Sequence, residues 1–143
     1  MPSRATKQRK PVKLSPTHRP AHMSVEEWQL GLRRQYAREQ PLKVRKLGRE
    51  PVFSEFAVTN PRTKGSYRVA IRGDSPGVNY CSCPDYAVNT LGVCKHIEAV
   101  LLRLRRGHRT LLQQGYQPEF PEVYVRYGSR RDIVLSPGRS NAP

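Results

Sequence analysis

Residues 81–97 read CSCPDYAVNTLGVCKHI and contain every cysteine of the chain together with His96. Cys81 and Cys83 are two positions apart, so their side chains point to the same side of an extended strand. Cys94 and His96 have the same spacing, but residues at i and i+2 of a regular helix point about 200° apart. We therefore expect Cys94 to lie just before a helix or in its first turn, with His96 reaching back toward the sulfurs.

Three thiolates and one imidazole form a soft set of four ligands, which matches the tetrahedral preference of zinc. The sequence therefore predicts a Zn²⁺ site with Cys81, Cys83, Cys94 and His96 as ligands. Four protein ligands leave no position for water, so we expect the zinc to be structural. A ferrous site of the rubredoxin type fits less well, because it uses four thiolates. An odd number of cysteines cannot complete a disulfide framework, which favours a reducing compartment.

The residues before the cysteines alternate between apolar and polar side chains from Val52 onward. Two such stretches flank the turn-forming residues 60–65, which predicts an antiparallel hairpin with one buried and one wet face. The apolar positions of this hairpin are Phe56, Val58, Tyr67, Val69 and Ile71. After a second turn, Val78 and Tyr80 open a third short strand, and we expect both to point into the core, away from the sulfurs.

The residues after Cys83 predict two helical segments separated by a glycine. Asp85 can cap a short helical turn, and Gly92 breaks it while giving the metal loop the backbone freedom that it needs. A longer helix is predicted over 94–106, with Gly107 placed to end it. Its apolar face consists of Ile97, Val100, Leu101 and Leu104.

The N-terminal part of the chain predicts an unstructured segment followed by a helix. Residues 1–23 are basic and rich in proline, so we expect a disordered arm that cannot bury enough apolar surface to fold. Ser24 and Glu27 fit a capping box at the start of a helix over 24–39. Residues 40–50 are interpreted as a basic connector.

The C-terminal part predicts two strands, over 122–127 and 132–135, joined by a turn and followed by a loose tail. The predicted fold class is therefore α+β: a small zinc-stapled ββα core with an N-terminal helix and a C-terminal β-hairpin. We divide the chain into an arm at 1–23, a helix and connector at 24–50, a zinc finger at 51–109, and a hairpin with its tail at 110–143.

Two runs of this sequence resemble the SWIM zinc finger, whose pattern is C-x-C-x(n)-C-x-H. They are Cys81-Ser82-Cys83-Pro84-Asp85-Tyr86 and Leu91-Gly92-Val93-Cys94-Lys95-His96-Ile97. The similarity spans about Phe53 to Leu104, and the predicted hairpin and helix match the ββα arrangement of that family. The resemblance implies that residues 51–109 form a SWIM-type zinc finger that binds DNA or another protein.

The run Asn89-Thr90-Leu91-Gly92-Val93-Cys94-Lys95-His96-Ile97-Glu98-Ala99-Val100 is most similar to the version in bacterial SWI/SNF-type helicases, where the finger precedes a large motor. This chain has no G-x-x-x-x-G-K-[ST] phosphate loop and no Gly-Lys dipeptide. We therefore expect no ATPase or helicase activity from the chain itself. It is interpreted either as an adaptor that docks onto a separately encoded helicase motor, or as a truncated N-terminal part of such a helicase.

The net charge is +15, and both halves of the chain contribute to it, with 13 basic and 4 acidic side chains in residues 1–50 and 13 and 7 in residues 51–143. A surface this basic attracts polyanions, of which nucleic acid is the commonest. Our leading hypothesis is a zinc-dependent module that binds nucleic acid, with DNA favoured by the resemblance. The candidate nucleic-acid-binding residues are Lys95, Arg103, Arg105, Arg106 and Arg109. Solvation at a helix end explains such a charge run equally well.

An enzymatic role is not expected. Cys94 beside His96 is similar to a thiol–imidazole pair, but zinc coordination would quench that nucleophile, and no third orienting residue is evident. No apolar run approaches the ~20 residues that cross a bilayer, so we expect no membrane contact. The expected location is the cytoplasm, or the nucleoid if the protein is bacterial.

Overall fold

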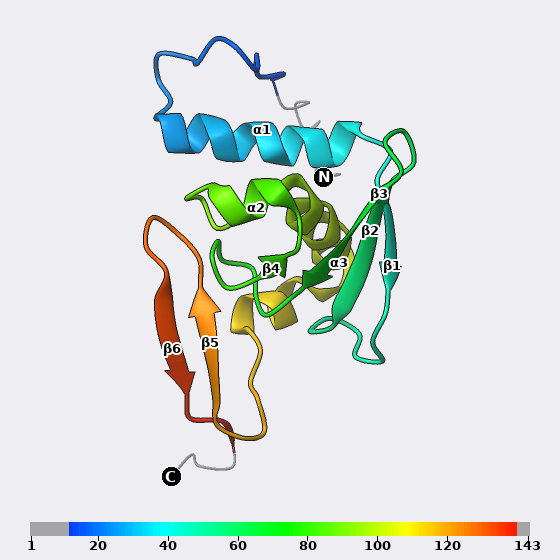
Figure 1. Ribbon diagram of the computed structural model, residues 1–143, viewed down its shortest axis with the longest axis vertical. Helices are drawn as coiled ribbons and strands as arrows, with labels where there is room; N and C mark the ends of the chain where they lie inside the picture. Colours follow the sequence, from blue (N-terminus) through cyan, green and yellow to red (C-terminus); the bar gives the residue numbers. More distant parts are fainter. Residues whose placement is uncertain (1–11, 140–143) are drawn as a thin grey trace, which may run out of the picture.

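The computed structural model describes residues 12–139, which form a mixed arrangement of helices and antiparallel strands (Figure 1). The predicted α+β class is confirmed. In chain order the elements are α1 (Val25–Glu39), β1 (Lys43–Lys46), β2 (Glu55–Asn60), β3 (Gly65–Ala70), β4 (Tyr80–Cys81), α2 (Pro84–Val88), α3 (Lys95–Gln114), β5 (Glu122–Arg126) and β6 (Asp132–Ser136).

A four-stranded antiparallel sheet in the order β1-β2-β3-β4 forms one side of the core. The predicted hairpin is β2–β3, in which Phe56 lies opposite Val69. One face of this hairpin packs against the apolar side of α3, and the expected apolar face of that helix is confirmed as buried. The core residues that the sheet and helix share include Phe56, Val58, Val69, Ile71, Ile97, Val100, Leu101 and Leu104.

Helix α1 begins at the predicted capping box and lies across α2 and α3 (Figure 1). The Ser24 hydroxyl accepts the Glu27 N–H at 3.1 Å, and the Glu27 carboxylate accepts the Ser24 N–H at 2.8 Å. Further along α1, Arg33 donates two hydrogen bonds to Asp85 of α2, at 2.7 and 3.0 Å. These bonds attach the N-terminal helix to the segment that carries the cysteines.

Strand β1 lies inside the stretch 40–50 that the sequence suggested was only a connector. A strand of three cations and Val44 shows no clear alternation, which is why the pattern did not reveal it. Val44 lies opposite Val58 and packs against the core, so pairing and burial hold the strand in place. Its lysines and arginine suit an edge strand, because charges discourage pairing with other chains.

The break that was expected at Gly107 is found at the next residue, because the backbone departs from helical angles at His108 (φ −136°, ψ 30°). What the sequence did not predict is a second helical segment beyond this kink, which carries α3 to Gln114. Leu112 on the second part is 1% exposed. Burial of that side chain outweighs the roughly 1 kcal/mol that a glycine costs inside a helix. The helix ends at Gly115, whose positive φ of 81° suits a glycine.

The predicted arm at residues 1–23 lies partly outside the described residues, which begin at Val12. Residues 12–23 contain no helix or strand, but they contact α1 where we expected disorder. Gln35 accepts the Leu14 N–H at 2.7 Å and donates to the Leu14 carbonyl at 3.1 Å. Trp28 donates to the Ser15 carbonyl at 2.9 Å. Hydrogen bonds from polar side chains of α1 therefore fix the backbone of this segment, although the segment has little apolar surface of its own.

The two C-terminal strands form a separate two-stranded sheet, as predicted, and residues 140–143 of the expected loose tail lie outside the described residues. This β5–β6 hairpin extends away from α3 (Figure 1). One of its faces is made of four exposed aliphatic side chains, namely Val123, Val125, Ile133 and Leu135. We call this the hairpin's aliphatic face. The division of the chain into four segments stays a prediction. Among the described residues, no helix is long and apolar enough to cross a bilayer.

Candidate metal centre

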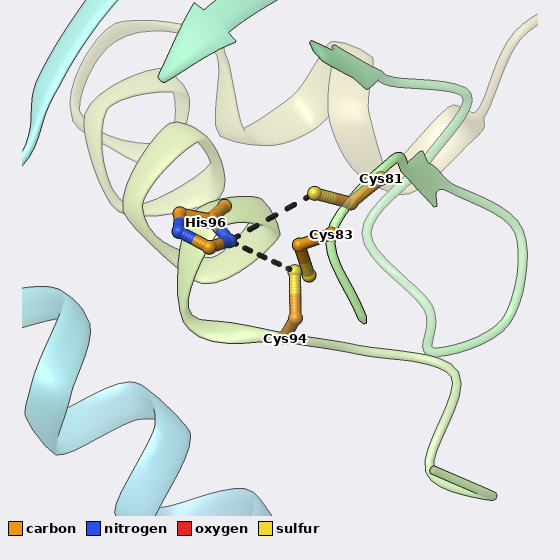
Figure 2. A group of neighbouring side chains, drawn as sticks. All are labelled: Cys81, Cys83, Cys94 and His96. Carbon is orange, nitrogen blue, oxygen red and sulfur yellow. Dashed lines mark hydrogen bonds between the residues drawn. The ribbon is translucent and has the colours of Figure 1, made fainter. Parts of the chain in front are cut away.

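Three secondary-structure elements deliver the four predicted ligands to one place. Cys81 ends strand β4, Cys83 is the N-cap of α2, and Cys94 is the N-cap of α3. His96 lies in the first turn of α3 and reaches back toward the sulfurs, as the i and i+2 spacing required (Figure 2). The four ligand atoms all lie within 4.8 Å of one another.

The separations fit a tetrahedral ion. Zinc bonds of about 2.3 Å to sulfur and 2.0 Å to nitrogen place a sulfur and a nitrogen about 3.6 Å apart around a tetrahedron. In the structure, His96 Nδ1 lies 3.9 Å from both Cys81 Sγ and Cys94 Sγ. Nδ1 is therefore the nitrogen that faces the ion position. The four side chains are positioned to bind a zinc ion, as predicted, and they form a closed set.

Backbone N–H groups at two helix ends support the sulfurs. Cys83 Sγ accepts the Tyr86 N–H at 3.4 Å, and Cys94 Sγ accepts the Ile97 N–H at 3.4 Å. These donors and the positive ends of the helices favour the thiolate form, which is the form that binds metal.

The sulfurs also set one another's protonation. Thiol hydrogen bonds from Cys81 and Cys94 hold the pKa of Cys83 well below its ordinary value. The hydrogen bond to Cys83, together with burial, raises the pKa of Cys81 to about 12. Hydrogen bonds to the other two sulfurs and burial also raise the pKa of Cys94. A dication that binds all three sulfurs must displace their thiol protons.

The metal ligands are themselves part of the core, which corrects the expected orientation of β4. Tyr80 is 44% exposed, whereas Asn79 and Cys81 are 2% and 1% exposed, so the sulfur side of the strand is the buried one. Val78 is only half-buried. The expectation assumed that the core and the metal lie on opposite faces of the strand. The three cysteines belong to the buried core cluster themselves, so the metal side of the strand also faces the core.

The loop between the second and third cysteines differs in its caps from the prediction. Cys83, not Asp85, caps α2, which ends at Val88 with Asn89 as its C-cap, before Gly92 is reached. Gly92 has a φ of +70°, and a Cβ there would lie 2.5 Å from the Tyr127 carbonyl oxygen. Only glycine fits this close approach of two backbones.

Sequence patterns missed one residue that positions β4. Buried Asn79 accepts the N–H groups of Arg72 and Gly73 through Oδ1, at 2.7 and 3.1 Å. Its Nδ2 donates to the Gly73 carbonyl at 2.9 Å. The side chain thus closes the turn that leads into the first cysteine. The only signal was a turn-forming residue placed two positions before Cys81.

The five candidate nucleic-acid-binding residues do not share one surface. Lys95 lies beside α1, where its Nζ donates to Gln40 Oε1 at 2.8 Å. Arg105 faces the other way and pairs with Asp74 at 2.7 Å and with the buried carboxylate of Glu98 at 3.6 Å. The charge of Arg105 is therefore compensated within the protein.

The remaining three arginines of α3 have no carboxylate partner within residues 12–139. Arg103 and Arg106 line a groove between α1 and α3, together with Arg38 of α1. Arg109 is exposed just beyond the kink at His108. We call the pocket lined by Arg38, Arg103 and Arg106 the arginine groove. The role of all five residues in nucleic-acid binding stays a prediction.

Residues 67–105 match the family model of the SWIM zinc finger. The matched region begins in β3, contains all four ligands and ends in α3. No curated protein and no solved structure matches the chain. The geometry and this match agree on a zinc-binding module, and the wider similarity to helicase N-terminal regions has no relative to support it.

Proposed function

We propose that this zinc-binding module binds nucleic acid, with DNA as the favoured form, and that phosphates occupy the arginine groove. The observation that supports this proposal most strongly is that Arg38, Arg103 and Arg106 line one groove without any carboxylate partner in the described part of the chain. Arg103 also donates to the Leu42 carbonyl at 3.4 Å, but no carboxylate in the described residues offsets the three charges, so an anion bound in the groove would stabilise them. Arginine is well suited to phosphate because its planar donors bind two oxygens at once.

The distribution of charge on α3 supports this assignment. Arg105 is held by Asp74 and Glu98 on one side of the helix, and Arg34 of α1 also contacts Glu98 at 3.5 Å. The structure therefore neutralises the arginines that join the helices and leaves those of the groove uncompensated. The net charge of +15 adds a long-range attraction to any polyanion.

The zinc has a structural task in this proposal, and no enzymatic activity is proposed. A closed set of four protein ligands offers no position for a substrate or an activated water. The ion would fix β4 and the start of α3, and thereby hold the helix that carries the groove arginines.

A salt titration of DNA binding tests the proposal. Each phosphate contact lowers the logarithm of the affinity by about 0.9 per logarithmic unit of salt. The double variant Arg103→Gln/Arg106→Gln should therefore bind more weakly and flatten this slope by roughly 1.8. Arg130→Gln is a matched control, because that side chain is 85% exposed and lies on the far hairpin turn. Equal slopes for the double variant and the wild type would contradict the groove assignment.

A second candidate function is an adaptor that docks onto another protein, such as a separately encoded SWI/SNF-type helicase motor. The aliphatic face of the β5–β6 hairpin favours it, since contiguous exposed apolar patches mark interaction surfaces. A complex that survives nuclease and is lost in Val125→Ser/Ile133→Ser would support the adaptor. If the complex forms with equal strength in that variant, the hairpin is not its interface.

A further inference from the structure

A cavity of about 580 Å³ lies between α1, the β2–β3 turn and the metal centre. Its walls include Tyr36 of α1, Asn60 and Tyr67 of the hairpin, and Lys95 and His96 of α3. Two tyrosine rings provide flat apolar surface, and the Tyr67 ring lies 4.8 Å from the imidazole of His96. This cavity is distinct from the arginine groove, and it borders the metal site through Cys83 and His96.

The imidazole of His96 presents an unused donor to this cavity. Since Nδ1 faces the sulfurs, the proton of the neutral ring is on Nε2, which Figure 2 shows on the side away from the cysteines. Metal-bound histidines normally donate this second N–H to a carboxylate, a carbonyl or water. His96 is only 5% exposed, and no group among the described residues accepts from Nε2.

Asn60 provides a second donor without a protein partner in the described residues. Its side chain is part of a residue that is 7% exposed, and Oδ1 accepts the Arg62 N–H at 3.0 Å. Nδ2 hydrogen-bonds to no group between residues 12 and 139. Neither nitrogen is a buried unsatisfied atom, so water can serve both donors in the free protein, and a ligand in the cavity can replace that water as the acceptor.

The other polar groups of the cavity also favour an acceptor-rich ligand. Lys95 contributes an ammonium group whose bonded partner is the neutral amide of Gln40. The carboxylate in the wall belongs to Asp85, and Arg33 already occupies it with two hydrogen bonds. Donors, a cation and flat aromatic walls together match a planar ring that carries carbonyl or ring-nitrogen acceptors and a nearby phosphate.

We propose that this cavity binds one unstacked nucleotide. The base packs against the ring of Tyr67 and accepts hydrogen bonds from Asn60 Nδ2 and His96 Nε2, while its phosphate lies near Lys95. The proposal rests on the nucleic-acid function above and adds a preference to it. A base inside a duplex is stacked and paired, so the cavity should select single-stranded over double-stranded nucleic acid.

The position of the cavity relative to the arginine groove supports a continuous strand path. Gln40 lines the groove and accepts from Lys95, which lines the cavity. A strand whose phosphates contact Arg103 and Arg106 can therefore continue past Lys95 and turn one base into the cavity.

Binding of a short single-stranded DNA and of its duplex, at one salt concentration, tests the inference. Base–aromatic stacking contributes about tenfold or more per base, so the wild type should prefer the single strand by about that factor. Tyr67→Leu should remove the preference while keeping an apolar side chain in contact with the core. Asn60→Asp keeps the acceptor for Arg62 and replaces the donor, so it should weaken single-strand binding to a similar extent.

Two controls keep the result interpretable. Tyr116→Leu removes a more exposed tyrosine ring outside the cavity and should change neither affinity. Zinc content should be unchanged in all variants, which separates loss of the ligand from loss of the fold. Equal binding of both forms by the wild type, or equal losses in the Tyr67 and Tyr116 variants, overturns the cavity proposal and leaves the groove proposal standing. Failure of every nucleic acid to bind overturns the function on which it rests.

A free mononucleotide distinguishes the source of the base. If it competes with the single strand in the wild type but not in Asn60→Asp, the cavity accepts free nucleotides as well as strands. If it does not compete while the single-strand preference persists, the strand is the ligand. Both results support the cavity, since each requires the preference that Tyr67→Leu removes.

Discussion

The zinc-binding unit and the β5–β6 hairpin use similar apolar residues with opposite results. In the first, Ile97 and Val100 are fully buried between the sheet, α3 and the metal ligands. In the second, Ile133 is 80% exposed, and its neighbours on the aliphatic face are also open to solvent. A count of apolar residues therefore does not identify a core. In the first region a sheet, a helix and the metal ligands cover the apolar side chains. A lone hairpin has no element that covers its second face.

The two regions meet at a small junction. The Tyr127 N–H donates to the Gly77 carbonyl at 2.9 Å, and Gly77 in turn donates to the Gly92 carbonyl at 2.9 Å. The Tyr127 ring lies 4.9 Å from that of Tyr86, a buried residue of α2. The hairpin is therefore anchored to the metal loop, so changes at the zinc site should reach the hairpin more strongly than the reverse.

Loss of the zinc should lower the stability of the protein more than any single substitution in the core or the hairpin. Binding of a structural zinc contributes roughly 10–16 kcal/mol in small zinc-finger peptides, which exceeds the ~5–15 kcal/mol stability of an ordinary domain. Cys83→Ser, or treatment with a chelator, should therefore abolish the cooperative thermal transition, measured by circular dichroism. A variant that melts like the wild type after losing its zinc would show that the ion is dispensable for this fold.

A matched pair of substitutions measures the contrast directly. Ile97→Ala should destabilise the protein by about 2–5 kcal/mol, because it leaves a cavity in the core. Ile133→Ala should change stability by no more than about 0.5 kcal/mol, since that side chain is exposed. Urea denaturation of both variants gives the comparison. Similar losses for the two would mean that the aliphatic face is covered, for example by association of the chain with itself.

A pair of glycines tests the junction. Gly92→Ala should cost at least about 1–3 kcal/mol, because an alanine with positive φ is strained and its Cβ would crowd the Tyr127 carbonyl. Gly107→Ala adds the same methyl group inside α3, where nothing lies within 4 Å, and should stabilise by up to about 1 kcal/mol. Thermal melts of the two variants should shift in opposite directions. A shift of both in the same direction would contradict the backbone geometry at Gly92.

A smaller loss of stability than at Gly92 is expected at the ion pair between Arg72 and Glu122, which ties β5 to the end of the four-stranded sheet. Glu122→Gln should lower global stability by about 1 kcal/mol or less, as partly exposed pairs usually do. Amide hydrogen exchange of residues 122–126 should nevertheless become faster, while exchange in α3 stays unchanged. Faster exchange in both elements would show that the hairpin and the zinc unit unfold together.

Sequence patterns predicted those parts of the fold that depend on local chemistry. The capping box of α1, the period of two in β2 and β3, and the metal-ligand spacing each follow from a few neighbouring residues. The patterns failed where distant contacts decide the outcome. Burial of Leu112 stabilises a second helical segment beyond the kink at His108, and pairing with β2 makes a strand of the basic residues around Val44.

In the candidate site, too, features set by local sequence were predictable and features set by distant contacts were not. The four ligands were identifiable from their residue types and spacing, since few other arrangements use every cysteine of a chain. The compensation of Arg105 by Asp74, and the unused donor of Asn60 at the cavity, were not identifiable. Both depend on which side of an element faces which neighbour, and that is fixed only by tertiary packing.

Zinc quantification joined to X-ray absorption at the zinc edge tests the central claim most directly. The purified protein should contain one zinc per chain, with three sulfurs at about 2.3 Å and one nitrogen at about 2.0 Å in the first coordination shell. A shell with oxygen in place of one of these ligands, or protein that folds and is pure yet binds no zinc, would contradict the closed Cys81, Cys83, Cys94 and His96 site.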